Sequence, residues 1–217
     1  ATFTGCDGGA FVRVEGDVEV AGDGDCVCSV GGNLAGWGDL PVLTEVGGDL
    51  GVSGSVLAPQ LLTLGGALTV EAGDEVRLPR LQSAASVGVS APGLTLLDLH
   101  DLEDVLGDVR VEGNPVLSQV DLSRLAELGG TLAITDNLSL QVVLGEGYAM
   151  RHIGGDLLLQ RNPMWVGFYG FGLLESIGGD VIVSEQDRFA VINGFTAVAT
   201  VGGDLRIADN ASLAVLE

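Results

Sequence analysis

A ten-residue unit that recurs along the chain limits the folds open to it more than any other feature of the sequence. Its last copy, residues 201–210, reads Val-Gly-Gly-Asp-Leu-Arg-Ile-Ala-Asp-Asn. Apolar and polar residues alternate after the glycine pair, and this period of two is typical of a short strand with one buried face. Further copies begin at Val46, Leu64, Leu128, Ile153 and Ile177. Regular recurrence predicts stacked repeats.

The first apolar residue after the glycine pair marks each coil. The markers are Val18, Leu34, Leu50, Leu68, Val87, Val109, Leu132, Leu157, Val181 and Leu205. The spacings between successive markers run 16, 16, 18, 19, 22, 23, 25, 24 and 24. A coil of this size cannot bury its own apolar face, so neighbours must stack at roughly 4.8 Å per rung. We therefore predict a mainly all-β, right-handed parallel β-solenoid of about ten coils that widens toward the C-terminus.

Short segments of the later coils have a different apolar spacing. Residues 122–128 read Leu-Ser-Arg-Leu-Ala-Glu-Leu, a spacing typical of one helical or 3₁₀ turn. We expect such turns in the later coils.

The corners of the predicted coils carry glycine and amide residues. The glycine pair permits a positive φ or a close backbone approach. Five residues after the marker, the late coils carry Asn114, Asn137, Asn162 and Asn210, with Gln186 in the remaining one. Asn tolerates left-handed geometry and bonds its side chain to backbone, so stacked coils predict a structural amide ladder.

We expect a single solenoid domain over residues 1–217. Residues 1–28 are predicted to form an N-terminal cap with cysteines, residues 29–105 the narrow coils, and residues 106–217 the wider coils. The last residues, 211–217, stop within a coil and show no capping helix. We expect an open C-terminal end, which either continues in a longer protein or stacks on another subunit, because strand edges invite pairing.

The late copies carry a recognisable pattern, Leu-x-x-Ile-Gly-Gly-Asp-Leu-x-Ile-x-x-Asn-x-x-Leu. Residues 153–162 and 201–213 match it well and residues 173–183 in part. The pattern resembles the repeat of receptor L domains, which are leucine-rich-repeat-like β-solenoids in insulin and epidermal growth factor receptors and in bacterial cell-surface proteins. The resemblance covers about residues 106–217 and implies a cell-surface solenoid of the bacterial type. The cysteine-rich and kinase regions of the animal receptors are missing, so growth-factor binding is not implied.

The charge of the chain excludes two classes of partner. It has 30 Asp and Glu residues and 9 basic residues, and its formal net charge is −21. Nucleic acid and anionic membrane surfaces both need positive charge at the contact, so neither is expected. No apolar run is long enough to insert in a membrane. The first six residues, Ala-Thr-Phe-Thr-Gly-Cys, fit a mature end after signal cleavage, which predicts an extracellular or cell-surface location.

All three cysteines lie close to the start of the chain, as Cys6, Cys26 and Cys28. A disulfide from Cys6 to Cys26 or Cys28 is the preferred interpretation, because it would staple the cap. Alternatively all three are reduced and buried. A zinc site is less favoured, because only His100 and His152 could complete it and both are distant in sequence. The acidic residues around His100 are expected to form a solvated face.

An aromatic cluster is the main candidate for binding. It consists of Trp165, Phe168, Tyr169 and Phe171. Exposed, the cluster would contact a protein or a glycan. Buried, it would fill the core beneath a wide connection.

A column of acidic residues that precede the markers is a weaker candidate, for calcium. Its members include Asp156, Asp180 and Asp204, and the loop with Asp23 and Asp25 gives a similar signal. Stacked carboxylates repel one another, and a hard cation would relieve this. The alternative is that Asp beside a glycine pair is an ordinary turn residue.

The sequence contains no nucleophile elbow, phosphate loop or zinc-protease motif, so we predict that the protein is not an enzyme and has no cofactor other than calcium. The favoured function is adhesion or recognition of a surface protein or glycan. The alternative is a structural subunit that binds copies of itself through the open coil and forms a filament or surface layer. A polysaccharide-acting enzyme is the weakest alternative.

Overall fold

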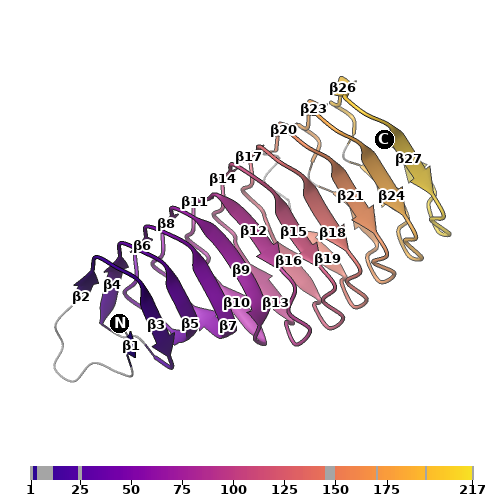
Figure 1. Cartoon of the computed structure of the whole chain (residues 1–217). Coiled ribbons are helices and arrows are strands. Elements are labelled where there is room, and N and C mark those ends of the chain that lie inside the picture. Colours follow the sequence, from indigo (N-terminus) through magenta and orange to yellow (C-terminus); the bar gives the residue numbers. More distant parts are fainter. Residues whose placement is uncertain are drawn as a thin grey trace.

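The computed structural model describes residues 2–3, 12–23, 26–144, 150–169, 171–193 and 195–216. These form the predicted all-β parallel solenoid, with no helix among them. Figure 1 shows the strands as successive rungs of an elongated stack, with the N-terminal end (indigo) and the C-terminal end (yellow) at opposite ends. Neighbouring rungs are parallel, as in the pairing of Val181–Ser184 with Leu205–Ala208.

Three sheets run along the stack. Sheet 1 follows the marker residues and contains β1 (Thr2–Phe3), β3 (Val18–Ala21), β5 (Leu34–Asp39), β7 (Leu50–Leu57), β9 (Ala67–Ala72), β12 (Ser86–Val89), β15 (Val109–Glu112), β18 (Leu132–Thr135), β21 (Leu157–Gln160), β24 (Val181–Ser184) and β27 (Leu205–Ala208). A second branch of sheet 1 contains β10 (Glu75–Arg77), β13 (Leu96–Asp98), β16 (Gln119–Asp121) and β19 (Val142–Leu144).

In each coil, the strand of sheet 2 comes directly before the glycine corner in the sequence. It contains β2 (Val12–Val14), β4 (Val27–Val30), β6 (Glu45–Val46), β8 (Thr63–Leu64), β11 (Ser83–Ala84), β14 (Asp104–Val105), β17 (Glu127–Leu128), β20 (His152–Ile153), β23 (Ser176–Ile177) and β26 (Thr200–Val201). Sheet 3 contains β22 (Gly167–Phe168), β25 (Val191–Ile192) and β28 (Val215–Leu216).

The marker residues stack in one continuous register along sheet 1. Leu34 lies opposite Val18 at one end, and Leu205 lies opposite Val181 at the other. Hydrogen-bonded partners in neighbouring coils have a sequence offset of 16 near the N-terminus and 24 near the C-terminus, which confirms the widening of the coils. Register is fixed because a slip by one residue would turn every marker from the core to solvent.

The predicted count of about ten coils is too high, since the described residues form about seven full turns. From β9 onward, each turn has a second, separate strand after its marker strand. These second strands are β10, β13, β16, β19, β22, β25 and β28. In the narrower N-terminal coils one long strand serves two faces. β7, for example, pairs with both β9 and β10. Because every narrow coil also has a marker residue, a count of markers includes the narrow coils and overestimates the number of full turns.

The described residues of the later coils also contain none of the predicted helical or 3₁₀ turns. In residues 122–128 the amide of Leu125 donates to the carbonyl of Leu122 at 3.1 Å, which makes a single β-turn. The next amide, that of Ala126, donates instead to Glu103 of the preceding coil at 2.9 Å. A helix needs consecutive local bonds, and the neighbouring coil takes the amide that would have continued it.

The core is one apolar cluster that runs through the stack from Val18 to Ile192. Most coils contribute their marker and the apolar residue two positions later, such as Leu157 and Leu159, both fully buried. Burial of such a side chain contributes about 1.5–3 kcal/mol. The core has no break that would separate residues 29–105 from 106–217, and the predicted division of the chain stays a prediction.

Close approach explains the glycine pairs, because no described glycine of a pair has a positive φ. A Cβ on Gly202 would lie 2.0 Å from the carbonyl oxygen of Gly178, and one on Gly203 would lie 2.0 Å from Oδ1 of Asp180. The left-handed corner is elsewhere, at the residue before each ladder amide. These residues are Gly113, Asp136, Arg161, Glu185 and Asp209, with φ between 54° and 69°.

Candidate functional site

The acidic column is a hydrogen-bond ladder between coils. Oδ1 of Asp156 accepts the backbone N–H of Asp180 at 2.8 Å, and Oδ1 of Asp180 accepts that of Asp204 at 2.8 Å. Asp23 has the same role for the amide of Asp39 at 3.2 Å. The ladder explains why these positions carry a short side chain with an acceptor oxygen.

Calcium binding by the column stays a prediction. In the part of the chain that the structure describes, no three His, Cys, Asp or Glu side chains converge in a way that could hold a metal ion. Asp25, the other member of the predicted loop site, lies outside the described residues.

The column also shows how a backbone amide affects a carboxylate. The pKa of Asp108 is lowered, first by the backbone N–H of Thr131 and then by the side chain of Arg110. The Thr131 amide donates to Oδ1 at 2.8 Å, and Arg110 Nη2 lies 3.0 Å from Oδ2. Both donors favour the charged form of the carboxyl group.

The amide residues form a second ladder in the interior. Asn114, Asn137 and Asn162 are fully buried. Oδ1 of Asn137 accepts both the backbone N–H and the Nδ2 group of Asn114, at 3.1 and 2.9 Å. The ladder continues through Gln186 to Asn210, whose Oδ1 accepts a hydrogen bond from the backbone N–H of Gln186 at 3.2 Å. These contacts satisfy the buried side chains of the asparagines and are structural, whereas Nε2 of the buried Gln186 has no hydrogen-bond partner among the described residues.

The aromatic cluster is divided between the core and the surface. Trp165, Phe168 and Phe171 are buried. Phe168 stacks on Phe171 with ring centroids 4.3 Å apart, and Trp165 meets Phe189 edge to face at 5.2 Å. Three of the four predicted contact residues therefore fill the core. Tyr169 remains exposed.

The structure does not bring the predicted cysteine and histidine positions together in one described site. Cys26 is buried directly before β4, Cys28 lies on β4, and Cys6 lies outside the described residues. His100 is exposed, with Nδ1 3.4 Å from a carboxylate oxygen of Asp121. His152 belongs to sheet 2, whereas His100 follows β13 of sheet 1.

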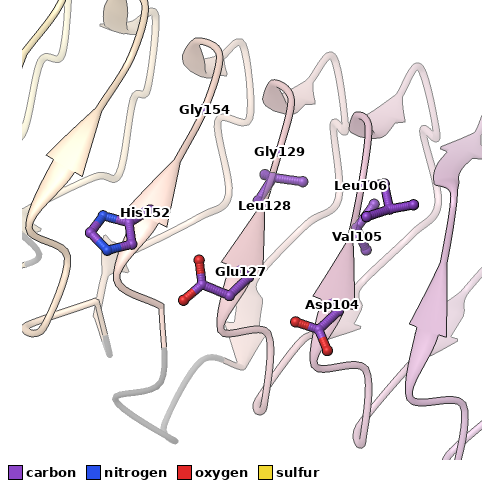
Figure 2. A pocket seen from close by; sticks show the side chains of 8 residues that line it. All are labelled: Asp104, Val105, Leu106, Glu127, Leu128, Gly129, His152 and Gly154. Atoms are coloured by element: carbon purple, nitrogen blue, oxygen red, sulfur yellow. The ribbon is translucent and has the colours of Figure 1, made fainter.

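The structure has a surface groove on sheet 2 that no sequence pattern predicted. Its volume is about 530 Å³, and its walls come from β14, β17 and β20 with the corners that follow them. Figure 2 shows Asp104, Glu127 and His152 on three successive rungs. The register places Glu127 directly between the other two. Nδ1 of His152 lies 2.9 Å from the hydroxyl of Ser176.

Leu106, at one end of the groove, breaks the repeat. It occupies the place of the first corner glycine, which Gly129 and Gly154 fill in the next two coils. Its side chain is 81% exposed, more than any other large apolar residue described. The departure of Val105-Leu106-Gly107 from the Gly-Gly pattern is the signal by which the sequence could have revealed this groove.

The groove carries unbalanced negative charge. Among the described residues, neither Asp104 nor Glu127 has an ion pair, although they lie on adjacent rungs about 4.8 Å apart. The nearby Arg124 pairs with Glu103, and Arg151 pairs with Glu175 at 2.7 Å. Like charges directly opposite each other destabilise a sheet, so a cationic group in the groove would be bound favourably.

Comparison with protein-family models, with curated proteins and with solved structures finds no match to the chain. No described helix is long and apolar enough to cross a membrane.

Proposed function

We propose that the protein is a non-enzymatic recognition protein that binds a basic, partly apolar segment of another protein in the groove of sheet 2. The observation that carries this proposal is Leu106, an exposed apolar side chain at a position that is alanine in the preceding coil and glycine in the two coils that follow. Leu106 gives a partner an exposed apolar contact beside the acidic residues, whereas Val105 and Leu128 of the same groove are buried. Asp104 and Glu127 supply the complementary charge for Arg or Lys.

The acidic character of the whole chain supports the same partner chemistry. A net charge of −21 attracts basic partners over long range and raises their association rate at low salt. The strands of the groove are hydrogen-bonded to their neighbours on both sides, so this protein loses little conformational entropy when a partner binds. The cell-surface or extracellular location and the relation to receptor L domains belong to this proposal, on the basis of the repeat pattern.

The proposal is tested with an array of synthetic peptides of graded basic and apolar content, followed by titration of the best binder. We expect binding that weakens with salt and falls at least tenfold in Leu106→Gly and in Glu127→Gln. Leu106→Gly restores the glycine of the repeat, so it should fold normally.

Two matched controls are available. Leu138→Ala alters an exposed leucine outside the groove, and Glu45→Gln alters an acidic residue of sheet 2 that does not line the groove. Both should bind like the original chain. Absence of any bound basic peptide, or equal losses in the controls, would contradict the proposal.

Asp104 and Glu127 also favour a second candidate, hydrolysis of a polysaccharide. They lie on adjacent rungs, whose spacing of about 4.8 Å is close to the roughly 5–5.5 Å that separates the two carboxyl groups of retaining glycosidases. However, both side chains are exposed, whereas a general acid gains its raised pKa from burial. Release of reducing sugar from acidic and neutral polysaccharides, abolished in Glu127→Gln, would favour this function over recognition.

A further inference from the structure

Trp37 is an exposed tryptophan on the outer face of sheet 1. It is 48% exposed, whereas Trp165 is 1% exposed. Trp37 lies on β5 and does not belong to the apolar core. A buried aromatic side chain removes roughly 150–250 Å² from water, and a half-exposed one forgoes much of that stabilisation. Core packing therefore does not explain the presence of tryptophan at this position.

The backbone around Trp37 fixes its place. The flanking residues Gly36 and Gly38 have φ of 138° and 126°. A Cβ on Gly36 would lie 1.7 Å, and one on Gly38 1.9 Å, from a carbonyl oxygen of the preceding coil. The register shift between β5 and β7 places Trp37 opposite residues 53–55. A Cβ on Gly54 would lie 2.8 Å from Cγ of Trp37, so the side chain rests directly on β7.

Two surface hollows flank Trp37 along the strands. Their volumes are about 310 and 160 Å³. On β7, residues 51–53 line the first hollow and residues 55–57 the second, so Trp37 and the Gly54 beneath it lie between them. β9 completes the first hollow and β10 the second, and both strands pair with β7 (Figure 1). We call the two hollows and the indole ring together the Trp37 surface.

Each hollow has hydrogen-bonding groups and one unbalanced carboxylate. Thr69 and Glu71 line the first hollow, and Asp39, Glu75 and Arg77 line the second. Glu75 and Arg77 form an ion pair at 2.8 Å, so their charges cancel. Among the described residues, neither Asp39 nor Glu71 has an ion pair, and both are exposed. The Trp37 surface therefore carries one uncompensated negative charge on each side of the indole.

These groups fit a chain of sugar rings that carry free amino groups. The flat indole offers an apolar contact to the C–H face of a ring and also attracts a cation. Carboxylates accept hydrogen bonds from hydroxyl and ammonium groups, and Arg77 donates to hydroxyl oxygens. The two unbalanced carboxylates favour a cationic sugar over a neutral or an anionic one. Lys and Arg side chains have no acceptor for Arg77, which favours the sugar over a basic peptide.

We propose that the Trp37 surface binds an oligosaccharide of amino sugars with free amino groups. One ring stacks on Trp37, and the rings on either side lie in the two hollows. This surface belongs to the narrow coils of sheet 1, whereas the groove near Leu106 belongs to sheet 2. Its function therefore does not depend on the groove.

The test titrates the whole chain with a linear oligomer of glucosamine and follows tryptophan fluorescence. Trp37 and Trp165 are the two tryptophans of the chain. Because Trp165 is buried, a change in emission reports on Trp37. We expect a saturable change whose midpoint rises with salt. The fully N-acetylated oligomer of the same length has the same rings without the positive charge and should bind at least tenfold more weakly.

Variants are compared by calorimetric titration, which does not need the indole. Trp37→Ala should weaken binding at least tenfold, whereas Trp37→Tyr keeps an aromatic face and should lose less than threefold. Glu71→Gln should weaken binding about fivefold. Tyr169→Ala removes an exposed aromatic ring elsewhere, and Glu45→Gln removes a carboxylate that lines neither hollow. Both controls should bind like the original chain.

Three outcomes would overturn the proposal. The first is no binding of the glucosamine oligomer, and the second is equal affinity for the N-acetylated oligomer. The third is oligolysine that binds more tightly than the glucosamine oligomer and loses its affinity in Trp37→Ala, which would assign the surface to a basic peptide. Leu106→Gly should retain full affinity for the glucosamine oligomer, which separates this proposal from that of the groove.

Discussion

At the scale of single residues, each pair of corner glycines lies against the backbone of the coil before it. A Cβ on Gly179 would be 2.0 Å from Oδ1 of Asp156, the oxygen that also accepts the amide of Asp180. A Cβ on Gly88, in β12, would meet nothing within 4 Å. A methyl group at Gly179 would therefore collide with the neighbouring coil, whereas one at Gly88 would not.

We predict that Gly179→Ala lowers the free energy of unfolding by about 3 kcal/mol, because the new methyl group displaces the Asp156 carboxylate or separates the coils. Gly88→Ala should stay within about 0.5 kcal/mol of the original chain. Urea denaturation followed by circular dichroism measures both. Similar midpoints for the two variants would show that the corner can relax.

The sequence predicted the role of some of these residues and misplaced others. Asn137 was expected in a ladder from its fixed distance to the marker, and its side chain bonds to both neighbouring coils. The left-handed corner was expected at the same residue but lies at Asp136. The spacing of the asparagines shows which residues stack on one another. The position of the positive φ depends on the path of the backbone through the corner, which the spacing does not show.

At the scale of elements, the column beside sheet 1 can use carboxylate or amide oxygens. Asn33 accepts the amide of Asp49 at 2.8 Å, the same distance at which Asp108 accepts that of Thr131. The hydrogen bond needs only an acceptor oxygen. A carboxylate in this place adds a dependence on pH that an amide does not have.

We predict that Asp108→Asn reduces the loss of stability in acid. The folded pKa of Asp108 is lowered, so its carboxylate stabilises the fold above the unfolded pKa of about 3.9, and this contribution disappears as the pH falls through the folded pKa. Unfolding midpoints between pH 7 and pH 2 measure the difference. Parallel pH curves for the two proteins would contradict it.

The sequence pattern predicted the strands correctly but not the corner turns. Residues 205–208 were predicted as a strand because alternation has only one structural meaning when one face is buried. Residues 122–128 were predicted as a helical turn, but a Leu-x-x-Leu spacing fits a single β-turn equally well. The neighbouring coil decides, because it takes the amide of Ala126, and no local pattern encodes that contact.

At the scale of the whole molecule, the groove of sheet 2 was not predicted. Asp104, Glu127 and His152 come from three successive coils and meet only through the register of the stack. Outward positions have no packing constraint, so their residue types follow no period. Only the comparison of equivalent positions along the stack makes Leu106 stand out.

The N-terminal coils give the third prediction, a disulfide between Cys6 and Cys26. Cys26 is buried at the end of the stack, whereas Cys28 is partly exposed. We expect the cross-linked peptide to persist in Cys28→Ser and to be lost in Cys26→Ser, by mass spectrometry without reduction. Reduction should lower stability by about 2–4 kcal/mol. Three alkylatable thiols in the native protein would contradict the disulfide and the oxidising location that it implies.

The gradual change of coil length has a consequence for folding. Stacked repeats with similar faces can pair out of order, because a coil that skips its neighbour finds an equivalent surface further along. In the N-terminal half, each coil from Leu50 onward has a different length from the next, so a skipped coil would meet a cross-section of the wrong size. The length gradient thus encodes the order of the coils there, while the equal coils near the C-terminus lack this protection against misassembly.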